Sequence, residues 1–423
     1  MVSKTKKVVT IVGQGYVGLP LAQAAAHAGW TVWGLDVTPT LVDLLNSGQS
    51  HIDDLSDSDI RGMLEAGYRA TTDPSVVSSS DVVVICVPTP LGEGGSPDLG
   101  AVKGASRTVG DNLVAGTTVI LESTTYPGTT DDVVRPLLEM NSGLTAGTDF
   151  ELAYSPERVD PGSKKYGIKN TPKLMGGITD ASTQAAVAFY GSFVDQPVPM
   201  AGMREAETAK LLENTFRHVN IALVNEMAKF CKELNIDIWE VIRGASTKPF
   251  GFMKFTPGPG VGGHCIPIDP NYLSYEVRNQ LGYPFRFVEL AQEINNSMPR
   301  YVVERVGDLL NEHRKPINGS EILILGVTYK ADIADQRESP ALPVAEILLE
   351  RGATVRFHDP MIDTWQLGAT SLVREPDLGA AVNEVDAVVV LQAHDSYNLE
   401  AIANDSKLML DTRGVAPRPA VRL

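Results

Sequence analysis

The strongest constraint on the fold is a pattern of strand, glycine turn, helix and strand that occurs twice, over residues 8–36 and 321–359. In both copies an apolar run precedes a glycine, and the second strand ends in an aspartate. Each copy continues into a further apolar run preceded by an aspartate, over residues 81–85 and 386–390. Strands and helices that alternate at this spacing are typical of parallel βαβ units. We therefore predict an α/β protein with two doubly wound, Rossmann-like domains, one near each end of the chain.

The chain length and one long helical pattern predict a third, helical domain between these two. At roughly 100 to 200 residues per domain, 423 residues correspond to two or three domains. Residues 203–234 contain no proline or glycine and repeat apolar side chains at three- and four-residue steps, which predicts one long helix. Its apolar stripe alone fits a face of the intramolecular core, and a dimer contact is the alternative. We expect an N-terminal domain over residues 1–200, a central helical domain over 201–300 and a C-terminal domain over 301–423.

Composition and charge exclude several classes of protein. With 43% hydrophobic and 21% charged residues, the chain has the composition of an ordinary globular protein. Its net charge of −16 has the wrong sign for nonspecific binding to nucleic acid or to an anionic membrane. No run approaches the roughly 18 apolar residues that span a bilayer, and the three cysteines show no CxxC pair and no metal-ligand spacing. We predict a cytoplasmic protein with no bound metal and no nucleic-acid or membrane partner.

Residues 13–18 read Gly-Gln-Gly-Tyr-Val-Gly, directly after the first strand and at the start of an Ala-rich helix. In this context the first glycine permits a tight turn, the second admits a pyrophosphate and the third lets the helix pack on the strand. Asp36, at the end of the second strand, can accept a hydrogen bond from a ribose 2′-OH and repel a 2′-phosphate, which favours NAD over NADP. The alternative is that the glycines serve only packing and that Asp36 caps a turn. We predict an NAD site formed by Gly13, Gly15, Tyr16, Val17, Gly18 and Asp36.

Three other side chains have the chemistry of a catalytic site. Cys265 lies in a loop between glycines and prolines, and a thiol becomes a good nucleophile when a neighbouring cation favours its thiolate. A structural loop cysteine is an equal alternative. Lys210 and Asn214 share a face of the long helix and could serve as proton relay and oxyanion donor, although a solvated surface pair is the simpler interpretation. Cys86 and Cys231 fit core positions.

Seven short segments follow one another along nearly the whole chain. They are residues 13–20 (GQGYVGLP), 87–90 (VPTP), 122–128 (ESTTYPG), 155–158 (SPER), 210–214 (KLLEN), 262–265 (GGHC) and 329–330 (YK). In combination they resemble the nucleotide-sugar 6-dehydrogenases, the UDP-glucose/UDP-mannose dehydrogenase family. A histidine precedes the cysteine here, where the UDP-glucose branch usually has serine. In this feature the chain resembles the branch that acts on N-acetylhexosamines.

The resemblance implies a four-electron oxidation in which the C6 alcohol of a UDP-sugar becomes a carboxylate while two NAD are reduced. The carbon passes through an aldehyde, a thiohemiacetal and a thioester. A thiol must trap the aldehyde, because only the adduct keeps the carbon tethered and presents a hydride for the second transfer. The catalytic residues that the resemblance implies are Cys265 as nucleophile, Lys210 and Asp269 for proton transfer, Asn214 and Thr124 for an oxyanion or the water, and Glu157 for thioester hydrolysis.

The same resemblance assigns the N-terminal domain to NAD and the C-terminal domain to the UDP-sugar. It adds Thr89, Thr124 and Arg337 to the cofactor contacts. The substrate contacts that it implies are Glu157, Arg158, Lys210, Asn214, Gly258, Gly260, Gly262, Gly263, His264 and Lys330. The substrate that it favours is UDP-N-acetylglucosamine, with UDP-N-acetylmannosamine, UDP-N-acetylgalactosamine and UDP-glucose as alternatives. It also implies a homodimer.

Two other functional classes compete with this interpretation. A hydroxyacid dehydrogenase of the 6-phosphogluconate type also has the glycine turn and a helical Lys-x-x-x-Asn, but it needs neither a nucleophilic cysteine nor a second nucleotide domain. A non-catalytic NAD sensor would show degraded catalytic positions, whereas those named above are all present. The chain departs from the family pattern at Leu41, where a cation is common, and at Asn271, where an aromatic residue is usual.

Overall fold

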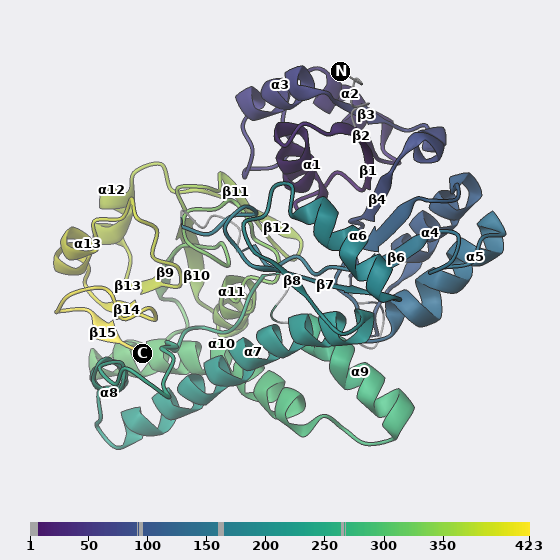
Figure 1. The fold of residues 1–423 in the computed structure, drawn as a ribbon. Helices are drawn as coiled ribbons and strands as arrows, with labels where there is room; N and C mark the ends of the chain where they lie inside the picture. The colour runs from purple at the N-terminus through teal and green to yellow at the C-terminus, as the bar shows by residue number, and fades with distance from the viewer. Residues whose placement is uncertain (1–6, 91, 93–95, 160–164, 264–265, 267) are drawn as a thin grey trace. The chain divides into compact units, whose positions relative to one another are not determined.

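The structure is a computed structural model, and it describes residues 7–90, 92, 96–159, 165–263, 266 and 268–423 (Figure 1). The chain forms two compact units, residues 1–213 with 271–283 and residues 214–270 with 284–423. Helices α7 (Met203–Glu233) and α9 (Asp269–Leu281) each pass from one unit to the other. Helix α7 confirms the long helix that the sequence predicts over residues 203–234. The domain boundaries at residues 200 and 300 stay predictions.

The first unit is built on an eight-stranded sheet. Its strands are β1 (Val8–Val12), β2 (Thr31–Leu35), β3 (Tyr68–Thr71), β4 (Val82–Ile85), β5 (Thr118–Leu121), β6 (Glu151–Tyr154), β7 (Lys173–Gly177) and β8 (Pro197–Pro199). They lie in the order β3-β2-β1-β4-β5-β6-β7-β8, and all neighbours are parallel except β6 and β7. Its other helices are α1 (Gly18–His27), α2 (Pro39–Asn46), α3 (Asp57–Ala66), α4 (Gly100–Asn112), α5 (Arg135–Ser142) and α6 (Asp180–Tyr190).

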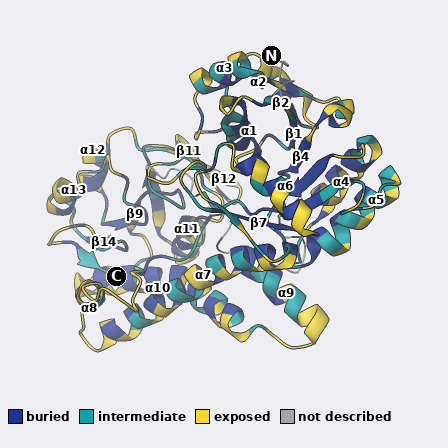
Figure 2. Ribbon diagram, in the orientation of Figure 1, coloured by how far each residue is buried: buried dark blue, intermediate teal, exposed yellow. Residues whose placement is uncertain are grey.

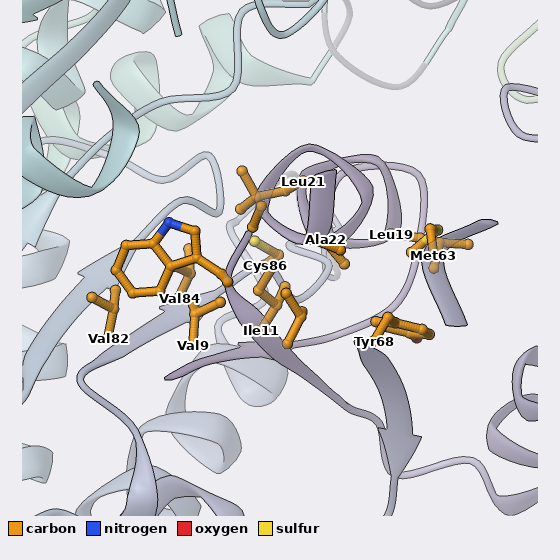
Figure 3. Close-up of a cluster of buried hydrophobic side chains, with 14 of the residues drawn as sticks. Val9, Ile11, Leu19, Leu21, Ala22, Met63, Tyr68, Val82, Val84 and Cys86 are labelled. Atoms are coloured by element: carbon orange, nitrogen blue, oxygen red, sulfur yellow. The ribbon is translucent and has the colours of Figure 1, made fainter. Parts of the chain in front are cut away.

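The central strands of this sheet are buried on both faces, as a parallel sheet between two helical layers requires. Val82 and Val84 of β4 join a core with α1, α3 and α6, whereas Val83 and Ile85 join a second core with α4 and α5. Figure 2 shows buried strands flanked by helices that expose one side. Figure 3 shows the first core, to which Cys86 belongs. Cys86 is buried, so its predicted core position is confirmed, and this burial raises the pKa of its thiol.

The second unit contains a five-stranded parallel sheet in the order β10-β9-β13-β14-β15. Its strands are β9 (Glu321–Leu325), β10 (Thr354–His358), β13 (Ala387–Val390), β14 (Met409–Asp411) and β15 (Val421–Arg422), and β11 (Thr364–Leu367) pairs with β12 (Thr370–Val373) in a separate hairpin. Its other helices are α8 (Ile238–Ala245), α10 (Arg286–Glu312), α11 (Ala341–Glu350), α12 (Leu378–Glu384) and α13 (Leu399–Asp405). Among the described residues, no helix combines the length and apolarity needed to cross a bilayer.

Strand β9 of the second unit repeats the two-sided burial of β4. Ile322 and Ile324 face a core with α10 and α11, while Leu323 and Leu325 face a core with α12 and α13. Helices therefore cover both faces of a parallel sheet in each unit. This arrangement confirms the prediction of two doubly wound, Rossmann-like folds with helical segments between them.

The same glycine turn follows β1 in the first unit and β9 in the second. Gly13 has a φ of +91° and donates its N–H to the carbonyl of Leu35 at the end of β2, at 2.8 Å. Gly326 has a φ of +78° and donates to the carbonyl of His358 at the end of β10, at 3.0 Å. A Cβ on either glycine would collide with a backbone carbonyl oxygen, at 2.7 and 2.4 Å respectively. Only glycine fits these positions, so the repeat in the sequence is a repeat of one backbone turn.

Candidate active site and cofactor site

The turn between β1 and α1 leaves open space beside one of its three glycines. A Cβ on Gly13 or Gly18 would lie 2.7 or 1.9 Å from a backbone oxygen, whereas a Cβ on Gly15 would meet no described atom within 4 Å. Tyr16 and Val17, the other predicted contacts, lie in the same turn. Within the described part of the chain, no side chain caps the start of α1. Uncapped N–H groups at a helix start attract an anion, so the turn fits the pyrophosphate of a dinucleotide.

Asp36 follows β2 and binds this turn directly. Its Oδ2 accepts from the backbone N–H of Gln14 at 2.9 Å, and its Oδ1 accepts from that of Thr38 at 3.0 Å. Asp36 therefore does cap a turn, as the alternative interpretation held. Each carboxylate oxygen has a second acceptor site, so capping and ribose binding are compatible. Leu41, at the position where the family commonly has a cation, packs against the hydrophobic core.

Thr89 and Thr124 lie just beyond the carboxyl ends of β4 and β5. The Thr89 hydroxyl donates to the carbonyl of Thr124 at 2.8 Å, and the Ser123 hydroxyl donates to the carbonyl of Val87 at 2.7 Å. The Tyr272 hydroxyl donates to the carbonyl of Thr89. Parallel strands present their carboxyl ends at one edge of a sheet. The structure thus brings both predicted cofactor residues to the edge that holds the glycine turn.

A cluster of charged groups lies at the same edge, beyond β5 and β6. The Nζ of Lys173 lies 2.6 Å from a carboxylate oxygen of Glu122, 3.6 Å from one of Glu157 and 3.1 Å from the carbonyl oxygen of Pro156. The hydroxyl of Tyr190 donates to the other Glu122 oxygen at 2.5 Å. Lys173, Glu122 and Tyr190 are buried and Glu157 is half-buried. Because β7 runs antiparallel to β6, its first residue, Lys173, reaches this edge.

The charges in this cluster shift its pKa values in opposite directions. Burial raises the pKa of Glu122 to about 7 against the opposing charge of Lys173, and the negative charge of Glu157 raises it further. Burial also acts upward on Glu157, but the charge of Lys173 and a hydrogen bond with Glu122 outweigh it, so its pKa is lowered. Burial acts to lower the pKa of Lys173, but the two carboxylates raise it overall. Near pH 6 the proton therefore resides on Glu122 and Glu157 is ionised.

Lys210 also acts on Glu157. Lys210 is only 9% exposed on α7, and its positive charge helps to lower the pKa of Glu157. Asn214, one turn further along, is 6% exposed, so the interpretation of these two residues as a solvated surface pair is wrong. The guanidinium of Arg158, a predicted substrate contact, pairs with Glu213 at 2.6 Å. The charge of Arg158 is thus balanced within the protein.

In the second unit, Asn214 meets a second predicted catalytic residue. Its Nδ2 donates to Oδ2 of Asp269 at 2.5 Å, and Asp269, the first residue of α9, is buried. This hydrogen bond fixes the orientation of the Asn214 amide. Cys265 and His264 lie outside the described residues, so their roles stay predictions.

Gly258 and Gly260 of the predicted substrate loop lie close to other residues of the second unit. Gly258 donates its N–H to the Oδ1 of buried Asn225 at 2.9 Å. A Cβ on Gly258 would lie 3.1 Å from the guanidinium of Arg413, and a Cβ on Gly260 would lie 3.1 Å from Pro340. Burial lowers the pKa of Arg413 to about 10, although the negative charge of Asp411 acts against this shift. Arg413 is therefore a half-buried cation beside the loop.

The next two glycines pack against the segment after β9. A Cβ on either Gly262 or Gly263 would lie 2.7 Å from the side chain of Tyr329, and Gly263 donates its N–H to the carbonyl of Arg337 at 3.2 Å. The loop thus meets two segments that the sequence had assigned to ligands. The guanidinium of Arg337 itself pairs with Asp335 at 2.6 Å. Its assignment to NAD stays a prediction.

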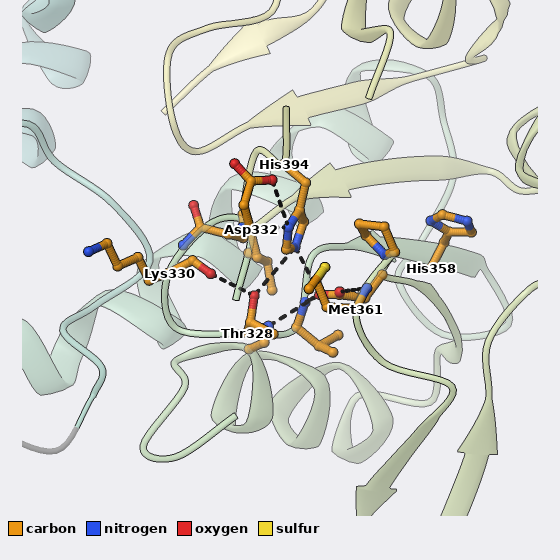
Figure 4. Close-up of polar contacts among 12 residues, drawn as sticks. Thr328, Lys330, Asp332, His358, Met361 and His394 are labelled. Atoms are coloured by element: carbon orange, nitrogen blue, oxygen red, sulfur yellow. Dashed lines mark hydrogen bonds and ion pairs between the residues drawn. The ribbon is translucent and has the colours of Figure 1, made fainter. Parts of the chain in front are cut away.

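The backbone around Lys330 is fixed by a buried aspartate and histidine (Figure 4). The hydroxyl of Thr328 donates to the carbonyl of Lys330 at 2.9 Å. His394 Nδ1 accepts from the N–H of Asp332 at 3.0 Å, so its Nε2 carries the proton and donates to Asp359 at 3.0 Å. The side chain of Lys330 extends away from this network. The network therefore positions the backbone of this segment.

A nucleotide-binding turn at the carboxyl edge of a Rossmann sheet, with a carboxylate at the ribose position, is typical of an NAD-binding protein. The chain belongs to the UDP-glucose/GDP-mannose dehydrogenase family. Sequence models of the family match residues 7–194 as its NAD binding domain, 204–297 as its central domain and 323–418 as its UDP binding domain. The protein is accordingly an NAD-dependent dehydrogenase of UDP-sugars.

Individual relatives match over almost their whole length. A UDP-N-acetyl-D-mannosamine dehydrogenase of Pyrococcus horikoshii is 34% identical over 420 residues, which are 98% of this chain and 97% of the relative. An NDP-N-acetyl-D-galactosaminuronic acid dehydrogenase of Ralstonia nicotianae is 34% identical, with 97% and 96% covered. The solved P. horikoshii enzyme superimposes with a TM-score of 0.89 over 98% of this chain and 97% of that one. A UDP-glucose dehydrogenase of Pyrobaculum islandicum gives 0.85 at 27% identity, with 98% and 95% covered.

Sequence reasoning missed several residues of these sites. Glu122 directly follows a buried strand, a position that could have drawn attention to it. Lys173 opens a strand and has no local signal, because its partners are 16 and 51 residues away. Arg413 and His394 each follow a strand of the second sheet, where side chains reach its carboxyl edge.

Two glycines of the turn, Gly15 and Gly18, give different predictions. Gly15→Ala should fold normally but weaken NAD binding about tenfold or more, because its methyl group occupies the space for the pyrophosphate. Gly18→Ala should instead destabilise the fold by about 1–3 kcal/mol through the clash with a backbone oxygen. Gly62→Ala, in open space on α3, is the matched control. Calorimetric titration with NAD and thermal melting separate these effects, and wild-type NAD affinity in Gly15→Ala would contradict the assignment.

Proposed function

We propose that the protein oxidises the C6 hydroxyl of a UDP-N-acetylhexosamine to the uronic acid with two NAD. The observation that carries the proposal is the full-length similarity to relatives whose names specify N-acetyl sugars. The names of these relatives favour UDP-N-acetylmannosamine or UDP-N-acetylgalactosamine beside UDP-N-acetylglucosamine, which the sequence led us to expect. These sugars differ in the configuration of ring carbons away from C6, so one reaction scheme applies to all three.

In this proposal the protein supplies covalent and proton-transfer chemistry, and bound NAD accepts a hydride in each oxidation. Cys265 attacks the C6 aldehyde and holds the carbon as a thiohemiacetal and then as a thioester. Lys210 and Asp269 move protons to and from the C6 oxygen. Asn214, oriented by its hydrogen bond to Asp269, donates to that oxygen. Glu157 takes a proton from the water that hydrolyses the thioester.

The second unit supplies the proposed contacts to UDP. The glycine loop lets backbone approach the nucleotide sugar, and Lys330 offers a cation at the carboxyl edge of the second sheet. Arg413 extends this set, because its half-buried positive charge lies next to Gly258. A diphosphate is an anion that either cation could bind.

The yield of NADH per sugar tests the proposed reaction. Limiting UDP-N-acetylhexosamine should give two NADH per molecule, because the second oxidation follows on the tethered carbon. The three UDP-N-acetylhexosamines and UDP-glucose should be compared at equal concentration with NAD in excess. One NADH per sugar would identify a simple alcohol dehydrogenase, and none with any UDP-sugar would contradict an enzymatic role.

We also propose that the protein is a homodimer joined through α7. One side of the apolar stripe of α7, with Val224, Ala228 and Cys231, is buried against Ile238 and Ile242 of α8, as an intramolecular core requires. On another side, Leu223 and Phe230 are 53% and 44% exposed and are seven residues apart, so they share a face. Intramolecular packing thus explains only part of the stripe. Large exposed apolar side chains on one helix face are typical of a protein interface.

A charge placed on this face should dissociate the dimer. We expect the wild-type protein to show twice the mass of one chain in light scattering coupled to gel filtration. Leu223→Asp should weaken the dimer at least tenfold, because an unpaired carboxylate would be buried in the contact. Val373→Asp, at a 73% exposed apolar position on β12, is the matched control. A wild-type protein that elutes as one chain would contradict the proposal.

A further inference from the structure

We propose that Glu122 and Lys173 are positioning residues for Glu157, which fix its carboxylate and keep it charged when the thioester is hydrolysed. The inference rests on the proposed function, in which Glu157 is the base for that step. It adds two residues for which the sequence suggested no role. They touch Glu157 and each other, and we assign them no contact with the substrate.

The charge balance of the cluster carries the inference. The ammonium of Lys173 lies 2.6 Å from Glu122 and 3.6 Å from Glu157, so two carboxyl groups share one contacting cation, and the charge of Lys210 acts on Glu157 from α7. An uncompensated buried charge costs several kcal/mol, so one carboxyl group keeps a proton near neutral pH. The other remains ionised and is available as a base.

Hydrogen bonds determine which carboxyl group carries the charge. Glu157 Oε1 accepts from the backbone N–H groups of Arg158 and Val159, and backbone N–H groups can only donate. Glu122 accepts from the Tyr190 hydroxyl and from Lys173, and its hydrogen bond with Glu157 raises the pKa of Glu122 and lowers that of Glu157. The charge is therefore stabilised on Glu157 and the proton on Glu122.

Two further groups in the described part of the first unit bear on this assignment. Lys210 on α7 adds a second positive charge, which favours ionised Glu157. Cys86, beyond β4, stays neutral because burial raises the pKa of its thiol. The groups that act on the two carboxyl groups are thus Lys173, Lys210, Tyr190, Cys86 and the N–H groups of Arg158 and Val159.

The step that depends on this arrangement is hydrolysis. A water proton passes to Glu157 while the water oxygen forms a C–O bond to the acyl carbon. The C–S bond breaks, and the sulfur leaves as a thiolate and then takes up a proton. This step consumes no oxidant, in contrast to the two NADH-forming oxidations that precede it.

The experiment measures uronic acid formation by the full-length enzyme from pH 5.5 to 9 with saturating NAD and UDP-N-acetylhexosamine. The wild-type rate should step upward near pH 7, where Glu122 loses its proton and Glu157 becomes more basic. E122Q should lose that step, because glutamine cannot titrate. K173M should be about tenfold or more slower at pH 7, because Glu157 holds a proton at that pH when the ammonium is absent. Its rate should recover at higher pH, where Glu157 loses that proton. K173R should restore the wild-type profile.

Controls separate this inference from the proposed function. Lys315→Met removes a lysine paired with Asp386 in the second unit and should leave the pH profile unchanged. E157Q should be slow at every pH, and an E157Q enzyme with wild-type rate would overturn both the role of Glu157 and the inference. If E157Q is slow but E122Q keeps the step near pH 7, the proposed function stands and the inference is overturned. Should K173M fail to fold, E122Q alone decides.

Discussion

The site of the first unit depends on one constraint, which is that parallel strands present their carboxyl ends at the same edge of a sheet. Strands β1, β4, β5 and β6 are all parallel, so the residues that follow them collect there. Thr89, Thr124 and Glu157 reach the edge in this way. Strand β7 is antiparallel to β6, so its first residue, Lys173, reaches the edge as well. One reversal of strand direction thus brings a cation to Glu122.

The buried charges at this edge have a cost that packing alone does not explain. Removing an ion from water costs several kcal/mol even after relaxation, and an apolar side chain of the same size is often as stable. Lys173 is compensated only because Glu122, Glu157 and the carbonyl of Pro156 surround its ammonium. A cluster of this kind is typical of functional sites, where burial and charge together shift pKa values.

The sequence predicts what depends on local pattern. Apolar runs and glycine turns predicted both Rossmann-like folds, and an uninterrupted apolar pattern predicted the long helix. The structure confirms these elements, and the turn at Gly13 has the backbone that its motif requires. Pairings across long stretches of sequence were not predictable. Asn214 and Asp269 are 55 residues apart, and the helical spacing of Lys210 and Asn214 says nothing about whether the fold buries them. The contact of Lys173 with Glu122 and Glu157 was not predicted, because it depends on the reversed direction of β7. The apolar pattern of a strand does not indicate its direction in the sheet.

The central claim is that the oxidised carbon is held covalently on Cys265 while Glu157 provides the base for its release. Intact-protein mass spectrometry of Glu157→Gln, mixed with NAD and a UDP-N-acetylhexosamine that the wild-type enzyme oxidises, tests it most directly. The account predicts an adduct with the mass of the whole oxidised UDP-sugar, joined to the protein through its C6 acyl group. Peptide digestion should map the adduct to Cys265, and it should be absent from the double variant that also carries Cys265→Ala. Full uronic acid production by Cys265→Ala protein, with no adduct in either variant, would contradict it.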